Sequence, residues 1–491
     1  MSHLRLRNSA PTEHETNAIR QRILDMGTQK RKIDAEILVL VDRLDTHGRR
    51  SLALQEEMTV LRATISPFRR LPVEVLSRIF LASLADALSS PSYRSDDIRQ
   101  PPHVLARVCS AWRTVALDTP ELWCAIHLAD LEKPWDGDGA LFIPTFAERS
   151  RRSPLHFKMS ISSNKLLGLW LSVMWPISER LESLTVCTPE GYLQALIGMT
   201  SAMFPALITL DLTVSPKPQG PSVVMDFVGE IDAFTTAPSL VTVRLSGLPG
   251  FARGNRSPLD GNRGLSMIRG NRQAVFEPRL PLSQLTELQL HCDDDLFEAR
   301  QILSLSVALE TFSLECCSSI GPTIDIPNCV LPKMRSLSLN VPDFARFLKP
   351  FSFPGLRELM LEGNYELTAE EVNALIQLHA KSRFELHSRA VLCLSFEAKA
   401  IVPFLLCTWS LKHLSLIDSV SADKDLFGIL TYSGEPGMHM LIPDLEELTI
   451  VHTPFKYVAA LKKMLQSRWW GDEGGGSTVH QWLLPYCNMP G

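Results

Sequence analysis

The sequence FPGLRELMLEGN, at residues 353–364, contains the pattern that decides the fold of most of this chain. A leucine is followed three residues later by a Leu-x-Leu pair, so Leu359 and Leu361 point to one side of an extended strand and Met360 to the other. With conservative exchanges the pattern occurs nine times, starting at Leu181, Leu207, Leu240, Leu285, Leu309, Met334, Leu356, Leu411 and Leu445. One such strand cannot bury its leucines alone, so neighbouring copies are expected to stack.

The copies resemble leucine-rich repeats, which are about 20–29 residues long. The interval from Leu356 to Leu411 has room for one degenerate copy, between Phe384 and Phe396. Between strands, Thr368-Ala-Glu-Glu371 has the form of a helix-capping box. The resemblance implies an α/β leucine-rich-repeat solenoid over residues 129–470, and the alternative is an ordinary α/β domain with leucine-rich strands.

A basic insert interrupts the repeats at about residues 251–279, where Gly-Asn-Arg occurs three times. It is either a flexible, solvated insert or a basic finger that grips an acidic partner. Residues 1–17 and 471–491 are expected to be flexible tails. Because 491 residues exceed one ordinary core, we expect a multidomain chain.

A second pattern occupies residues 67–128, and it predicts a small helical bundle. Leu71-Pro72 begins a helix, since proline needs no amide partner in a first turn, and an apolar stripe continues to Leu84. The segment SSPSYRSDDIRQPP reads as a loop. A single second helix is expected to contain Val104, Leu105, Val108, Trp112 and Val115.

Three sequence features of this bundle occur in a specific order: LPxEVLxxIF, then VCxxWR, then LW. Together they resemble the F-box, which implies binding to the Skp-type linker protein and cullin of an SCF-type ubiquitin ligase. With the helix that precedes it, the region is similar to F-box-like proteins of mushroom-forming fungi. The residues that the resemblance assigns to linker binding, some of which must form the module's own core, are Leu71, Pro72, Leu76, Ile79, Val108 and Trp112.

Residues 18–66 are expected to form a coiled-coil-like helix. Positions spaced alternately four and three residues apart form a narrow seam that is mostly apolar. Gly48 predicts either a break or two helices folded back as a hairpin. Two alternatives would cover this seam: self-association of the chain, or an intrachain hairpin or docking on the F-box. The seam comprises Ile19, Ile23, Met26, Lys30, Ile33, Ile37, Leu40, Leu44, His47, Ser51, Leu54, Met58, Leu61 and Ile65.

The residue between the paired leucines of each copy is a candidate substrate contact. Small polar side chains dominate this set and no single-sign patch occurs, which favours a protein substrate over a polyanion. The candidates are Thr185, Asp211, Arg244, Gln289, Ser313, Ser338, Met360, Ser415 and Thr449.

Two functions fit these features. As an F-box adaptor, the chain would bring a protein substrate to the ligase for proteasomal degradation, and it would not be an enzyme itself. The alternative is a ligase-independent leucine-rich-repeat scaffold for protein binding.

Other classes of function lack sequence support. The net charge of −5 predicts no binding to nucleic acid, and no P-loop, HExxH or G-x-S-x-G motif occurs. The ten cysteines form no CxxC pair, so we expect no metal site and no cofactor. No export signal and no apolar run of about 18 residues is present, so a cytoplasmic or nuclear protein without a membrane span is expected.

Overall fold

The chain divides into two compact units, Met1–Arg78 and Ile79–Gly491. The expected insert at 251–279 and the tail at 471–491 lie outside the described residues. The computed structural model describes residues 10–65, 67–90, 93–95, 97, 99–128, 142–160, 176–189, 204–215, 234, 237–247, 280–292, 296–316, 327–386, 389–395, 398–417, 424–431, 442–451 and 458–469.

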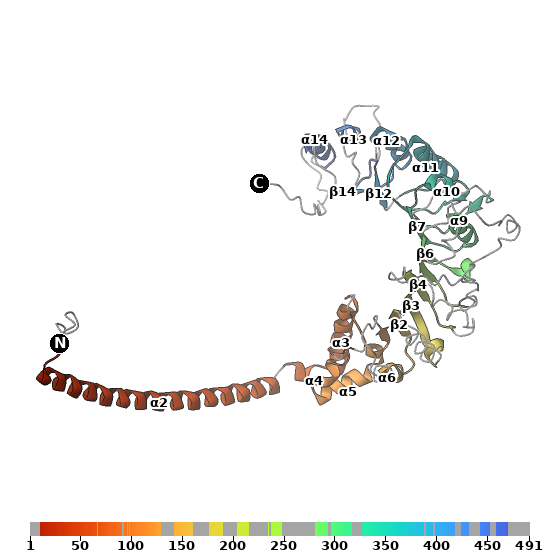
Figure 1. Cartoon of the computed structure of the whole chain (residues 1–491). Coiled ribbons are helices and arrows are strands. Elements are labelled where there is room, and N and C mark those ends of the chain that lie inside the picture. The colour runs from red at the N-terminus through yellow and green to blue at the C-terminus, as the bar shows by residue number, and fades with distance from the viewer. Residues whose placement is uncertain are drawn as a thin grey trace, which may run out of the picture. The chain divides into compact units, whose positions relative to one another are not determined.

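The first unit contains one long helix, α2 (Glu13–Thr64), which spans 52 residues without a break (Figure 1). It begins five residues before the predicted start, because Thr12 and Glu15 bond reciprocally in the manner of a capping box. The predicted break or hairpin at Gly48 is wrong. A glycine in an exposed helix costs only about 1 kcal/mol relative to alanine, which the rest of a long helix outweighs.

The helical bundle consists of η1 (Pro67–Arg70), α3 (Val73–Leu88), α4 (Leu105–Val108), α5 (Ser110–Asp118) and η2 (Pro120–Trp123). The prediction of a single second helix is wrong. Cys109 has an extended backbone that separates α4 from α5, and its sulfur accepts a hydrogen bond from the amide of Trp112.

Within the described part of the second unit, twelve parallel strands form one sheet, in which the spatial order follows the chain order. Every one of the nine predicted copies has its strand, and the predicted degenerate copy is β12. Two strands that the pattern did not predict, β1 and β2, begin the sheet. The twelve strands are β1 (Ala125–Leu128), β2 (Leu155–Ser160), β3 (Leu181–Pro189), β4 (Thr209–Ser215), β5 (Thr242–Ser246), β6 (Glu287–Cys292), β7 (Thr311–Cys316), β9 (Ser336–Asn340), β11 (Glu358–Glu366), β12 (Arg389–Ser395), β13 (His413–Ile417) and β14 (Glu447–Val451).

Helices connect many of these strands, and β8 (Cys329–Val330) pairs with β10 (Phe351–Ser352) in a small second sheet. The predicted capping box of Thr368 and Glu371 is confirmed at the start of α11. Figure 1 shows α9 to α12 on the outer side of the curved sheet. Among the residues that the structure describes, the helices of this unit after η2 are α6 (Phe142–Arg149), η4 (Ser178–Arg180), η7 (Leu282–Gln284), α9 (Leu296–Leu305), α10 (Phe344–Leu348), α11 (Ala369–Ser382), α12 (Ala398–Cys407), α13 (Lys424–Leu430) and α14 (Val458–Trp469).

The leucine that begins each copy, replaced by Met334 in one of them, lies in the core at 0–5% exposure in all nine copies. A tight turn precedes it: the amide of Leu207, for example, donates to the carbonyl of Phe204, and that of Leu356 donates to the carbonyl of Phe353. The next amides then bond to the preceding strand, as Ile208 does to Glu182. Each copy therefore brings its leucines into the same layer as those of its neighbour, which leaves the opposite face of the sheet polar.

Candidate functional site

The face of the sheet opposite the buried leucines is polar, and we call it the open face. Along β2 the exposed side chains of His156 and Lys158 alternate with the buried Leu155, Phe157 and Met159. The strands pair in register, so residues at equal positions form rows across the sheet. Two neighbouring rows of this face bear most of its charged side chains.

The nine predicted substrate contacts lie in one row, which we call the middle row. Thr185 pairs with Asp211, Asp211 with Arg244, and Arg244 with Gln289. The row continues in register to Thr449. Ser415 is the exception to the predicted accessibility: it is 4% exposed, so its side chain is not available to a partner.

A second row, two residues earlier in each strand, was not predicted. We call it the leading row, and it includes Glu287, Glu358 and Glu447. Arg244 of the middle row bonds to Glu287 at 2.9 Å, while the Thr242 hydroxyl donates to the same carboxylate at 3.3 Å. The guanidinium of Arg244 is therefore held by the leading row.

Asp211 lies next to Arg244 in the middle row, and burial raises the pKa of its carboxyl group. The positive charge of Arg244 and a hydrogen bond from Thr213 act in the opposite direction. Desolvation is the larger effect, as expected for a carboxylate that is half-buried in the face of a sheet.

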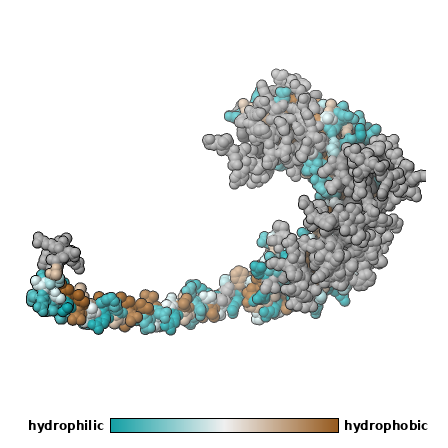
Figure 2. All heavy atoms as spheres, in the orientation of Figure 1, coloured by the Kyte–Doolittle hydropathy of each residue, from teal (hydrophilic) through white to brown (hydrophobic). Residues whose placement is uncertain are grey.

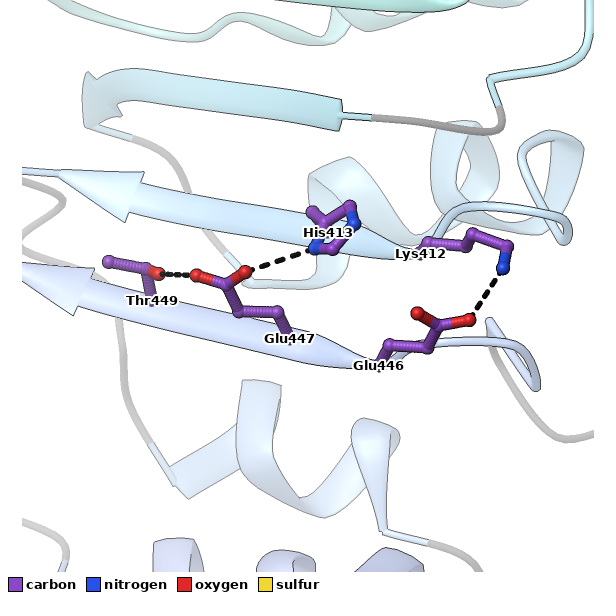
Figure 3. Close-up of polar contacts among 5 residues, drawn as sticks. All are labelled: Lys412, His413, Glu446, Glu447 and Thr449. Carbon is purple, nitrogen blue, oxygen red and sulfur yellow. Dashed lines mark hydrogen bonds and ion pairs between the residues drawn. The ribbon is translucent and has the colours of Figure 1, made fainter. Parts of the chain in front are cut away.

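At the C-terminal end of the sheet the open face carries a second polar cluster, in β13 and β14 (Figure 3). The Nδ1 atom of His413 lies 3.0 Å from Glu447, and the Thr449 hydroxyl donates to the same carboxylate at 3.2 Å. Beside them, Lys412 bonds to Glu446 at 2.5 Å, and this hydrogen bond raises the pKa of Lys412. Side chains from adjacent strands thus hold each other in place.

At its N-terminal end the open face carries His127, His156 and Lys158, which β1 and β2 contribute. Burial lowers the pKa of His127 to about 4, and the charges of Lys158 and His156 add to the effect. His127 is therefore neutral at physiological pH. From β4 onward carboxylates outnumber permanent cations among the described side chains, with Asp211, Glu287, Glu315, Glu358, Glu362 and Glu447 against Arg244.

The residues predicted to bind the linker differ in their exposure within the helical bundle. Leu76 is buried at 6% exposure and belongs to the module's own core, as expected for some of these residues, whereas Ile79 and Val108 are exposed at 41% and 54%. Trp112 is half-buried and packs on Phe80, with ring centroids 4.9 Å apart. Leu71 is half-buried and Pro72 is exposed.

Burial also reveals residues that the sequence patterns missed. Val104 was assigned to a helix and not to the site, but its side chain is 43% exposed. Trp123 is fully buried: its indole donates to the Ala116 carbonyl at 2.8 Å, and its ring meets Phe146 edge-on at 5.2 Å. The closing Trp of the motif therefore joins the bundle to the start of the sheet.

The described part of the chain contains no group of side chains that suits a metal ion and no helix that suits a membrane. No three of its His, Cys, Asp or Glu side chains are grouped so that they could hold a metal ion. None of its helices combines the length and the apolar character needed to cross a membrane. No protein-family model matches the sequence, and no curated protein matches it either.

Proposed function

We propose that this chain is an F-box-type substrate adaptor of an SCF-type cullin ubiquitin ligase. Residues 67–128 would bind the Skp-type linker, and residues 129–470 would form a leucine-rich-repeat solenoid that binds a protein substrate. The proposal rests on the resemblance of the LPxEVLxxIF, VCxxWR and LW features to the F-box, together with the burial pattern of those features.

The observation that supports linker binding best is the exposure of Ile79, Val104 and Val108. Their neighbours in the same motif, Phe80 and Trp123, are fully buried. The bundle therefore fills its core and still exposes aliphatic side chains, as expected of a surface that a protein partner covers. In such interfaces a few buried anchors provide most of the binding free energy.

The repeat region supports the second half of the proposal. Its strands follow the chain order and pair in parallel, with helices between many of them. A strand-then-helix repeat stacked in this way is the arrangement expected of leucine-rich repeats.

The open face favours a protein substrate. Its carboxylates disfavour a polyanion such as nucleic acid, which requires clustered Lys and Arg. Its Ser, Thr and Glu side chains instead suit hydrogen bonds to peptide groups and to basic side chains. Ubiquitin transfer would then need only proximity between the bound substrate and a recruited conjugating enzyme.

The test compares two exposed valines on the intact chain. Val108→Lys places a charge on the proposed linker surface, while Val307→Lys changes a valine of nearly equal exposure, 52% against 54%, beyond α9. We expect Val108→Lys to weaken linker binding at least roughly tenfold and Val307→Lys to leave it unchanged, as measured by titration calorimetry.

Equal effects of the two substitutions would contradict the proposed surface. Failure of the intact, folded chain to bind the linker at all would contradict the adaptor function. The ligase-independent scaffold would then be the better account.

A further inference from the structure

The first unit exposes an apolar seam along the whole of α2. Every seam position from Ile23 to Ile65 is exposed, and Leu44, for instance, is 75% exposed. Figure 2 shows brown apolar patches along this helix between teal polar ones. Because α2 is continuous, no hairpin within it covers the seam. A helix with such a seam needs a partner helix.

The seam has a symmetry that identifies the partner. The midpoint of Glu13–Thr64 lies between Leu38 and Val39. If a second copy of α2 runs antiparallel about this point, both helices overlap over their full length. Ile37 then packs against Leu40 of the second copy, and Ile33 packs against its Leu44. These central layers are all aliphatic.

Charges beside the seam fit the same register. Each heptad of the seam has two positions, and the first of them is followed three residues later by the second, as Ile37 is by Leu40. In an antiparallel pair, the residues that directly precede these first positions face each other across the two helices. Glu36 meets Arg43 of the second copy, and Arg22 meets its Glu57. On the other flank, Glu13 meets Arg62 of the second copy. Each attractive pair occurs twice by symmetry.

Neighbouring registers lose this complementarity. A shift of one heptad in one direction brings Glu36 against Glu36 of the second copy, and in the other direction it brings Arg43 against Arg43. In the full-overlap register no like charges meet beside the seam. The remaining flanking pairs there are Glu15 with Thr64, Gln29 with Arg50, Arg20 with Gln55, Asp34 with Val41 and Gly27 with Gly48.

A parallel pair fits the seam less well. It would place Lys30 beside Lys30 of the second copy, and a buried pair of like charges is costly. The antiparallel pair instead places Lys30 beside His47, and Asp34, which bonds to Lys30 at 2.8 Å, remains next to it. Glu36 would face the uncharged Val41 in a parallel pair, so its charge would contribute little there.

We propose that α2 binds a second copy of this chain as an antiparallel coiled-coil dimer centred between Leu38 and Val39. At about 1.5 Å per residue, the C-terminal ends of the two 52-residue helices lie about 78 Å apart. The two chains thus leave the coiled coil at opposite ends. This inference does not depend on the proposed ligase function.

The experiment measures dimer dissociation of the full-length protein by sedimentation equilibrium. The intact chain is expected to be a dimer. Glu36→Arg alone and Arg43→Glu alone each turn two attractions into repulsions, so each should weaken the dimer roughly tenfold. The double variant restores opposite charges and should return the dissociation constant to within about threefold of the intact value.

Glu56→Arg is the matched control, because it makes the same charge change on the side of α2 that points away from the seam. It should leave the dimer unchanged, and circular dichroism should give equal helix content for all four variants. A monomeric intact chain would overturn the proposal. So would a Glu36→Arg effect no larger than that of Glu56→Arg, or a double variant no tighter than the single ones.

Linker binding distinguishes this proposal from the adaptor function. A dimer that does not bind the linker contradicts only the adaptor. A monomer that binds the linker contradicts only the dimer.

Discussion

At the scale of single residues, Gly247 determines how closely two repeats approach. It follows β5 with φ of 65°, and a Cβ atom there would overlap the carbonyl oxygen of Val214. Gly247→Ala is expected to lower the free energy of unfolding by about 1–3 kcal/mol, through both the strained backbone and the overlap. Urea denaturation measures the change.

Gly428→Ala provides the control for Gly247→Ala. Gly428 lies inside α13 with no neighbour within 4 Å of an added Cβ. It should therefore be neutral, or stabilising by up to about 1 kcal/mol, because alanine is the better helix former. Equal losses in the two variants would contradict the role given to Gly247.

His127 makes the stability of the second unit depend on pH. Its pKa is about 4 in the folded chain, against about 6.5 when unfolded, because burial disfavours the charged form. The unfolded state therefore binds more protons between these values, and stability is lost as the pH falls from about 6.5 to about 4. With allowance for partial exposure, the loss is on the order of 1–2 kcal/mol.

The variant His127→Gln removes this titration. Its unfolding free energy should fall less than that of the intact protein between about pH 7 and about pH 4.5. Urea midpoints measured at the two pH values check this expectation. An unchanged pH dependence in the variant would show that other groups are responsible.

The middle row could be predicted residue by residue because a strand alternates strictly, so the position between two core leucines must face outward. The same alternation places Glu287 and Glu447 on this face, two residues before the middle row, but the prediction included only the residue between the paired leucines. The burial of Ser415 was not predictable, since its hexamer LKHLSL resembles the other eight.

At the scale of elements, α11 owes its start to a capping box. The Thr368 hydroxyl and the Glu371 carboxylate each bond to the other's backbone amide. Thr368→Ala should cost about 1 kcal/mol, whereas Thr368→Ser keeps the acceptor and should cost less than half as much. Thermal unfolding of both variants tests this, and equal losses would argue against the cap.

The periodicity of apolar residues did not predict where these helices begin and end, because the backbone at single residues determines the boundaries. The apolar spacing from Val104 to Val115 fits one helix, yet Cys109 ends α4 and caps α5. Conversely, Gly48 suggested a break in α2 that does not occur. The cost of one glycine is small against the continuous hydrogen bonding of a 52-residue helix.

At the scale of the whole molecule, η2 and the start of the sheet share one core within the second unit. Trp123 packs on Phe146, and β1 follows directly as the first strand. The repeat pattern does not reveal β1 and β2. Trp123 takes the place of the first leucine before β1, and in β2 the buried Leu155, which pairs with Leu181, lies only two residues before Phe157 because the register shifts there. The predicted boundary at residue 128 therefore follows the first strand of the sheet instead of preceding it.

This shared core predicts how fragments behave. A fragment of residues 67–491 should unfold at nearly the temperature of the intact second unit. A fragment of residues 129–491 loses Trp123 and exposes β2 as an edge, so it should aggregate or unfold about 10 °C lower. Thermal unfolding of the two fragments measures this difference in unfolding temperature. Equal unfolding temperatures would contradict the shared core.

The central claim is that this chain recruits the Skp-type linker. The most direct measurement is the mass of the full-length protein mixed with excess purified linker, by size-exclusion chromatography with light scattering. The account predicts one linker per chain, two chains and two linkers in the dimer, and loss of the linker in Val108→Lys but not in Val307→Lys. Elution of the folded chain at its own mass, with the linker free, would contradict it.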